Sequence, residues 1–428
     1  MSKLFIALEN EEVLLMDQQQ EIVNDIEIQK LENESNEYIV EVQQMDDVVS
    51  TAIESMSQLV NIEKILQTSV DRDKGLPEDA AEIAKTAIET ICIRLGYTPA
   101  KNIIPSLESF GEVSRIDATK YALESIKETV TKIWDAIKTF FINIWNKLKD
   151  FWKFITDINI RLKKKVETTQ QRVYNLIRTN AVVKDNSSID ITKYCIAFNS
   201  KNANNIMNDL AQTFTAHIYI TRIQSQINAR LNRFVDLVEK HADINEINEY
   251  GTETSHIYFK GIDKKLIFGK MFNLKEGIDL RFNGIKSNKI KPENTESKVL
   301  DIGDLSKIVK ASKALLNDNI DTIEQYNKLK KVVYKTIKAV NKISDEIRTS
   351  NKVDNNYYDT TDNFLKSANL RIIASNLRHQ TNDAYWFNTL VPKINAQAIS
   401  LGCDLVNLNI KQYISTSAVS KSTDLVVV

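Results

Sequence analysis

The chain has 428 residues, of which 43% are apolar and 26% charged, and it contains only 10 glycines and 5 prolines. This composition is typical of a folded, strongly helical protein of two or more domains and excludes disorder throughout the chain. Three widely spaced cysteines without CxxC spacing exclude a disulfide framework and a structural zinc site. The apolar run at Leu4–Leu8 is too short for a signal sequence, and no run is long enough for an ordinary membrane span, so we expect synthesis in a cytoplasm.

The charge is unevenly divided along the chain. Residues 1–108 contain 22 acidic and 8 basic residues, and residues 109–428 contain the remaining 35 and 48. The net charge of −1 is therefore the sum of −14 and +13. Such an asymmetry indicates a charged partner for at least one part of the chain. We expect three regions: an acidic helical region at 1–108, a long helix region at 109–185 and a helical domain at 186–428.

The acidic region is predicted to be helical but not to fold alone. Apolar residues at helical spacing predict one or two helices within residues 10–70, and Pro77 begins a further helix that ends near Gly96. Prolines and a glycine in residues 97–114 predict an exposed linker. Only 3 of the 33 aromatic residues precede residue 108, too few for an independent core.

The strongest periodicity lies between residues 119 and 162. Apolar residues recur there at steps of three and four and predict one continuous amphipathic helix. Its apolar face is widened by four aromatic residues, Trp134, Phe141, Trp145 and Trp152, and its other side is rich in lysine. Burial within a helical bundle is the favoured explanation. Two alternatives are contact with a membrane surface, which such helices can make, and burial in another protein of an assembly.

The remaining sequence predicts more helices and one small sheet. We expect helices at residues 203–242, 305–348, 362–377 and 384–414. Five glycines spaced 7 to 10 residues apart predict an antiparallel β meander at about residues 252–286. The predicted fold class is mainly α, an elongated helical bundle with a small β meander and a short polar C-terminal tail.

No catalytic or cofactor motif is found. The four histidines lack HExxH spacing, and Gly269-Lys270 lacks the upstream glycine of a phosphate-binding loop. We therefore predict that the protein is not an enzyme and that it holds no metal or cofactor.

Lysine clusters predict non-specific contact with nucleic acid. The candidates are two groups of consecutive lysines in a part of the chain with a net charge of +13, namely Lys163, Lys164 and Lys165, and Lys330 and Lys331. They fit contacts to phosphate better than base reading, for which no known module is present.

The sequence at the charge reversal carries a resemblance. It reads Pro105-Ser106-Leu107-Glu108-Ser109-Phe110-Gly111 and continues through Ala118-Thr119-Lys120-Tyr121-Ala122-Leu123-Glu124 into the tryptophan-rich helix. This combination resembles internal head proteins of large tailed bacteriophages.

The resemblance implies a processing pathway. In that family a prohead protease removes an acidic propeptide after a glutamate in motifs such as Ser-x-Glu, and the basic product stays with the DNA. For this chain the resemblance implies a processing site formed by Ser106, Leu107, Glu108 and Ser109, with the cut after Glu108. It also implies synthesis in the host cytoplasm and a place in the capsid interior of the virion. The implied partners are packaged double-stranded DNA, other head proteins and the prohead protease, and the product can be ejected with the genome.

Two other functions fit parts of the sequence. A helical pore-forming protein would also combine a bundle with a small β insert, but an insert that enters a membrane should be apolar. Here it contains several basic residues, among them Lys264, Lys265, Lys270, Lys275 and Arg281. A cytosolic coiled-coil scaffold is the second alternative.

Overall fold

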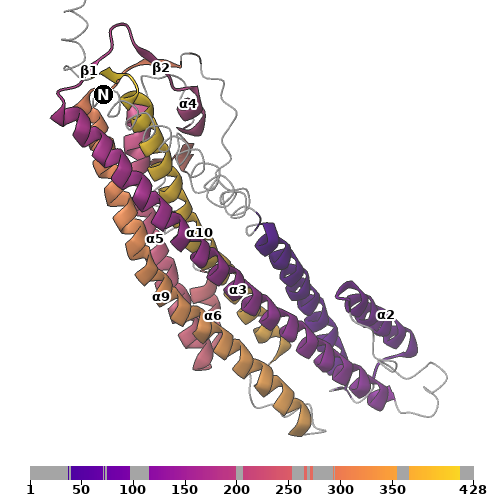
Figure 1. The fold of residues 1–428 in the computed structure, drawn as a ribbon. Helices are drawn as coiled ribbons and strands as arrows, with labels where there is room; N and C mark the ends of the chain where they lie inside the picture. Colours follow the sequence, from indigo (N-terminus) through magenta and orange to yellow (C-terminus); the bar gives the residue numbers. More distant parts are fainter. Residues whose placement is uncertain are drawn as a thin grey trace, which may run out of the picture.

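The computed structural model describes residues 37, 40–70, 72, 75–96, 115–198, 206–252, 265–267, 270–272, 293, 295–353 and 366–414. They form an elongated bundle of long helices (Figure 1). Its four main members are α3 (Arg115–Arg178), α5 (Ile206–Glu239), α9 (Ile302–Val353) and α10 (Ser367–Ile410). The 64 residues of α3 give it a length of about 96 Å at about 1.5 Å per residue. The predicted fold class, a mainly α bundle with a small β component, is confirmed.

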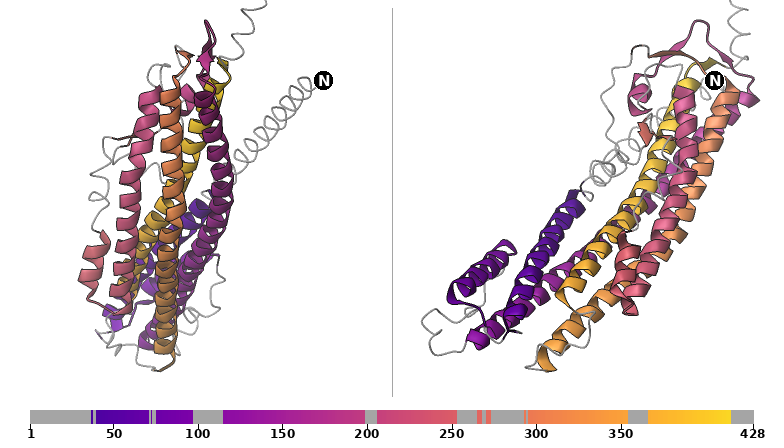
Figure 2. Two further views of the ribbon diagram at one scale, coloured as in Figure 1. Left: turned by 60° about the vertical axis from the view of Figure 1, so that its left-hand side comes forward. Right: turned by 180° about the vertical axis from the view of Figure 1, so that it is seen from behind.

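The contacts between helices define their directions. Trp134 contacts Val340 while Asn159 contacts Asn319, so α3 and α9 are antiparallel. In contrast, α3 and α10 are parallel, and α5 and α9 share the opposite direction, as Figure 2 also shows. The chain therefore returns along the bundle between α5 and α9. This return contains α6 (Ile244–Thr252) and three short strands.

Three two-stranded antiparallel pairs accompany the helices. β1 (Val182–Val183) pairs with β6 (Tyr413–Ile414), and β2 (Ser188–Asp190) pairs with β5 (Glu296–Lys298) beside α4 (Thr192–Phe198). β3 (Lys265–Ile267) pairs with β4 (Lys270–Phe272) inside the predicted meander, of which residues 253–264, 268–269 and 273–286 lie outside the described part of the chain. The first two pairs were not predicted, because strands of two or three residues are too short to show alternation.

The N-terminal part packs on the bundle as a helical hairpin. Residues 40–70 are helical and are followed by α2 (Glu78–Arg94). We call residues 40–96 the N-terminal hairpin. Its buried residues, among them Met56, Leu59 and Ile88, join the same hydrophobic core as those of the four long helices. The hairpin therefore shares a core with the bundle.

The prediction of two helices at 362–377 and 384–414 is wrong. α10 is continuous from Ser367 to Ile410 and even contains Pro392. The polar stretch at 378–383 looked like a break, but Gln380 and Thr381 are buried, and Arg378 and Asn382 both donate hydrogen bonds to Asp46 of the N-terminal hairpin. α10 lies among α3, α5 and α9, so many of its polar residues are buried. Within the described residues, none of the helices combines the length and apolar character that crossing a membrane requires.

Candidate functional site

The tryptophan-rich face of α3 lies against α9. Trp134, Phe141 and Trp152 are buried, and Trp145 is partly buried at the edge of the core. The indole N–H of Trp134 donates to the carbonyl oxygen of Val340 over 3.2 Å. Trp145 and Trp152 both stack on Tyr326, with ring centroids at 6.3 Å and 4.6 Å. Burial, and then the charge of Asp150, raises the pKa of Tyr326.

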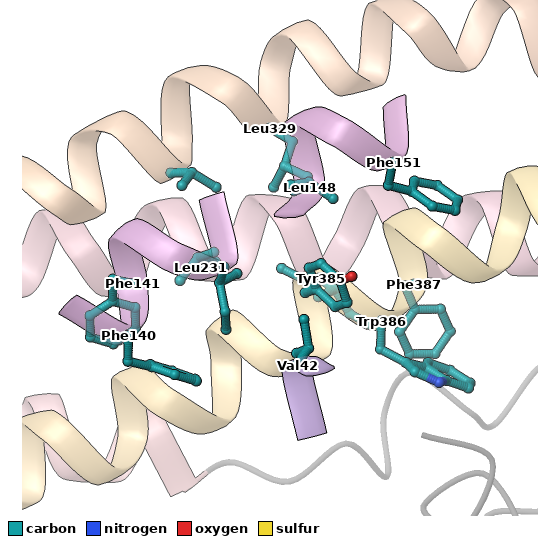
Figure 3. Close-up of a cluster of buried hydrophobic side chains, with 14 of the residues drawn as sticks. Val42, Phe140, Phe141, Leu148, Phe151, Leu231, Leu329, Tyr385, Trp386 and Phe387 are labelled. Atoms are coloured by element: carbon teal, nitrogen blue, oxygen red, sulfur yellow. The ribbon is translucent and has the colours of Figure 1, made fainter. Parts of the chain in front are cut away.

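Side chains from every long helix meet in this region. Figure 3 shows one cluster of buried side chains that includes Phe141 and Phe151 of α3, Leu231 of α5, Leu329 of α9 and Trp386 of α10. The α3 face is thus covered by the protein's own helices, and no lipid is needed to bury it. This arrangement favours the bundle explanation over a membrane-surface helix.

Buried polar side chains form layers along α10. Asn388 accepts a bond from Gln224 Nε2 at 2.8 Å and donates to Asn228 Oδ1 at 2.8 Å. In the next layer along α10, Asn319 donates a hydrogen bond to Asn159 Oδ1 at 2.7 Å and accepts one from Asn395 at 3.4 Å. A buried amide that loses its hydrogen-bond partner is costly. These layers therefore favour one axial alignment of the helices.

Two further layers are charged or mixed. Lys165 Nζ lies 2.6 Å from Asp404 Oδ1 and donates to Ser400 Oγ at 3.1 Å. Arg172 donates to Asn407 Oδ1 at 3.1 Å, and Asn407 donates in turn to Thr169. None of the four layers was predicted from the sequence. A signal existed for two of them, since Asn388 and Asn395 are seven residues apart and therefore lie on the same helix face.

Lys165 corrects one of the predicted DNA contacts. Its side chain is buried and paired with Asp404, so it cannot reach a phosphate in the folded protein. Lys163 and Lys164, which precede it, are exposed. The helical period explains the difference, because Lys165 lies three residues after the buried Leu162 and therefore continues the apolar face.

Lys330 and Lys331 lie on an exposed ridge of α9. They are followed by Tyr334, which is 71% exposed, and by the exposed Lys338. We call these four residues the α9 ridge. Neighbouring lysines have acidic partners: Lys328 pairs with Glu324, Lys335 with Asp236 and Lys342 with Glu346. Within the described part of the chain, the three ridge lysines have none.

The two lysine groups form separate patches. Trp152 is level with Tyr326 and Asn159 with Asn319 along the antiparallel pair α3 and α9. Lys163 is then level with roughly residue 315, so the α9 ridge begins about 22 Å further along the axis at about 1.5 Å per residue. The structure therefore presents two basic patches on one rod.

The predicted processing residues lie outside the described residues. Ser106, Leu107, Glu108 and Ser109 fall between the end of α2 and the start of α3. A second Ser-x-Glu triplet, Ser344 to Glu346, is helical and lies within α9, where Ser344 is buried. A protease needs an extended segment, so this triplet is a poor substrate in the folded protein.

The described cysteines are buried thiols, and the described residues contain no metal cluster. Cys92, Cys195 and Cys403 are free and buried. Burial is the main cause that raises the pKa of Cys403 to about 12, against a smaller opposite effect of Lys165. Among the described residues, no three His, Cys, Asp or Glu side chains are grouped to hold a metal ion.

These features define an elongated helical-bundle protein with basic surface patches and an acidic N-terminal hairpin. Residues 20–215 match the family model of the phiKZ-like phage internal head proteins. The match supports the resemblance predicted from the sequence around Glu108. The proteins of that family are internal head proteins of phages. Neither the curated proteins nor the solved structures contain a match.

Proposed function

We propose that the chain is an internal head protein in the capsid interior of a phage virion and that it is made with an acidic propeptide that is removed after Glu108. The remaining basic part contacts packaged double-stranded DNA without sequence preference. The observation that carries the proposal is the charge reversal at Glu108, from −14 to +13. Prohead protease, DNA and other head proteins are the proposed partners.

The position of the charge reversal supports proteolytic processing after Glu108. Of the three Ser-x-Glu triplets, the one that ends at Glu108 coincides with the change of charge and with a proline- and glycine-containing segment. It also separates the N-terminal hairpin from the first residue of α3, so a cut there leaves every described helix intact. N-terminal sequencing of the protein from mature virions should find Ser109. A terminus at Met1 or Ser2 alone would contradict the proposed processing.

The α9 ridge supports DNA contact. Lys330, Lys331 and Lys338 project positive charge without a described acidic partner, and Tyr334 between them offers an aromatic face. Lysines in this arrangement suit phosphates, and their binding gains from the release of counterions. An exposed tyrosine among them can also stack on an unpaired base.

The acidic region is expected to weaken this contact through its overall charge. The described contacts of the N-terminal hairpin are with α3 and α10, through pairs such as Glu41–Lys147 and Asp46–Arg378. In Figures 1 and 2 the hairpin and α9 lie on different sides of the bundle. A net charge of −14 on the same molecule nevertheless reduces the long-range attraction to DNA.

The test is a salt titration of DNA binding before and after removal of residues 1–108. A specific protease site is placed between Glu108 and Ser109 in the full chain, and binding to two unrelated duplexes is measured at several salt concentrations. We expect tighter binding without residues 1–108, equal affinity for both duplexes and a slope of about −0.9 in log K against log salt per phosphate contact. Equal affinity before and after removal, or a flat salt dependence, would contradict the proposal. Preference for anionic vesicles would favour the membrane alternative.

A further inference from the structure

The N-terminal hairpin is fastened to the bundle at several separated places. Near its turn, the backbone N–H of Leu76 donates to Thr119 Oγ1 of α3 at 3.0 Å. Further along, Cys92 Sγ lies 3.7 Å from Thr129 Oγ1. Between these polar contacts the hairpin contributes a row of fully buried apolar residues, which includes Met56, Leu59, Leu66 and Ile88. The attachment therefore extends over most of the hairpin.

A bidentate ion pair fastens the hairpin to α10. Arg378 donates from Nε to Asp46 Oδ1 at 2.6 Å and from Nη2 to Asp46 Oδ2 at 2.5 Å. Asn382, one turn along α10, donates to the same carboxylate. The Asp46 side chain is 5% exposed and that of Arg378 is 15% exposed, so water screens the pair poorly. Paired, parallel hydrogen bonds of this kind are among the strongest in proteins.

The turn of the hairpin fits closely against the start of α3. Gly75 has φ +60°, and a Cβ atom at this position would lie 2.5 Å from the carbonyl carbon of Arg115. Only glycine combines this backbone conformation with so close an approach. The hairpin is therefore shaped to this end of α3.

We infer that the N-terminal hairpin stays bound to the bundle after the backbone is cut behind Glu108, held by its apolar face and by Asp46, and that its release is a separate step. The covered face of α3 and α10 is then a binding surface for an acidic amphipathic helix, with Arg378 as the residue that recognises its carboxylate. The hairpin itself is the occupant that fits this surface. The inference deepens the proposed processing, but an engineered cut tests it even if no prohead protease acts at Glu108.

We expect the hairpin to stay bound because a backbone cut after residue 108 breaks none of its described contacts with the bundle. The cut lies between the last described residue of the hairpin and Arg115, whereas the contacts lie at residues 41–92. Departure of the hairpin would expose its buried apolar face and leave Arg378 without its carboxylate beside an apolar surface. Both consequences oppose dissociation.

The experiment follows the two fragments after an engineered cut. The full chain, with a specific protease site between Glu108 and Ser109, is purified, cut completely and analysed by size-exclusion chromatography at neutral pH. The expected result is co-elution of both fragments. Two fragments that separate as soon as the chain is cut would overturn the inference.

Two single variants test whether the ion pair of Asp46 and Arg378 holds the N-terminal hairpin on the bundle. Asp46→Asn should raise the rate of hairpin loss at least about tenfold, as the loss of one partner of a buried charge pair does. Glu41→Gln is the matched control, because its pair with Lys147 is more exposed and should change the rate less than about threefold. Equal effects of the two variants would remove Asp46 from its proposed role.

A double variant separates charge recognition from general loss of packing. Asp46→Asn combined with Arg378→Met leaves no buried unpaired charge and should recover much of the retention. Should Asp46→Asn alone prevent folding of the uncut chain, the double variant and the wild type decide the matter. If the double variant loses the hairpin as fast as Asp46→Asn does, Arg378 is not the recognising residue. N-terminal sequencing of virion protein reports on native processing independently of all these results.

Discussion

Trp152 of α3 and Tyr326 of α9 stack with ring centroids 4.6 Å apart and ring planes inclined by 26°. Trp145 stacks on the same tyrosine, nearly parallel at 9°. Tyr326 is therefore the residue of α9 that covers Trp145 and Trp152 on the tryptophan-rich face. Because the two helices are antiparallel and separated by more than 120 residues of chain, this contact is one of those that fix the tertiary fold.

Trp152→Asp should destabilise the bundle strongly. The substitution removes a buried aromatic ring and leaves an unpaired carboxylate, and we expect a loss of about 3–5 kcal/mol in the free energy of unfolding, measured by urea denaturation. Trp145→Asp should cost less, because Trp145 is only partly buried. The exposed Lys153 gives the control, since Lys153→Asp should change stability by less than about 1 kcal/mol. A Trp152→Asp variant that keeps its stability but no longer binds vesicles would contradict burial by protein.

Removing charge from the α9 ridge should weaken DNA binding in a salt-dependent manner. Lys330→Gln with Lys331→Gln removes two phosphate contacts, so the slope of log K against log salt should become shallower by about 1.8. The matched control is Lys328→Gln on the same helix, because Lys328 already pairs with Glu324. Filter binding over a range of salt concentrations measures both slopes. Identical slopes for the double variant and the wild type would place the DNA contact elsewhere.

The buried pair of Lys165 and Asp404 allows a paired test. Lys165→Met leaves Asp404 without its cation and should cost about 3–5 kcal/mol in unfolding free energy. Adding Asp404→Leu removes the remaining charge, and much of the loss should then be recovered. Lys164→Met is the control, because Lys164 is exposed and should have little effect. A double variant as unstable as the single one would show that packing, and not charge, governs this layer.

Alkaline pH should destabilise the protein through Cys403. Burial raises its pKa from 9.0 to about 12, so between these values the unfolded chain releases a proton that the folded protein retains. The contribution of this thiol is fully present below pH 9.0 and is lost as the pH rises toward about 12, by about 1.4 kcal/mol per unit.

The measurement compares urea denaturation at about pH 8.5 and about pH 10.5. Cys403→Ala should make the decline of stability with pH shallower. Val406→Ala, at a buried site without a titratable group, should lower stability equally at both pH values. If Cys403→Ala and the wild type decline in parallel, Cys403 does not contribute to the pH dependence.

The sequence predicted the outer helices of the bundle better than its centre. Regular three-four spacing identified α3, because one of its faces is apolar and the other is polar. α10 has no such contrast, since apolar and polar residues are both buried around it. Its polar residues at 378–383 are explained by partners such as Asp46, which lies more than 330 residues away in the chain. Such pairings depend on the tertiary arrangement and leave no local pattern.

The basic patches also combine a feature that the sequence could predict with one that depends on the tertiary arrangement. Consecutive lysines at 163–165 look alike in the sequence, and only the phase of the helix separates the buried Lys165 from its exposed neighbours. That phase could have been read, because the apolar positions continue through Leu162 and Val166. Among the described residues the lysines of the α9 ridge have no acidic partner, and this could not have been predicted from the sequence. Asp236 of α5, for example, pairs with Lys335 and with none of the ridge lysines.

The polar layers along α10 have a mechanical consequence. Layers at Asn388, Asn395, Asp404 and Asn407 succeed one another along the helix axis. A force that slides α10 lengthwise past α3, α5 and α9 loads all of them in shear at once, because every polar group would leave its partner in the same small displacement. A force that pulls one end of α10 sideways breaks them one after another. The rod is thus stiff against lengthwise sliding and yields first to peeling from an end.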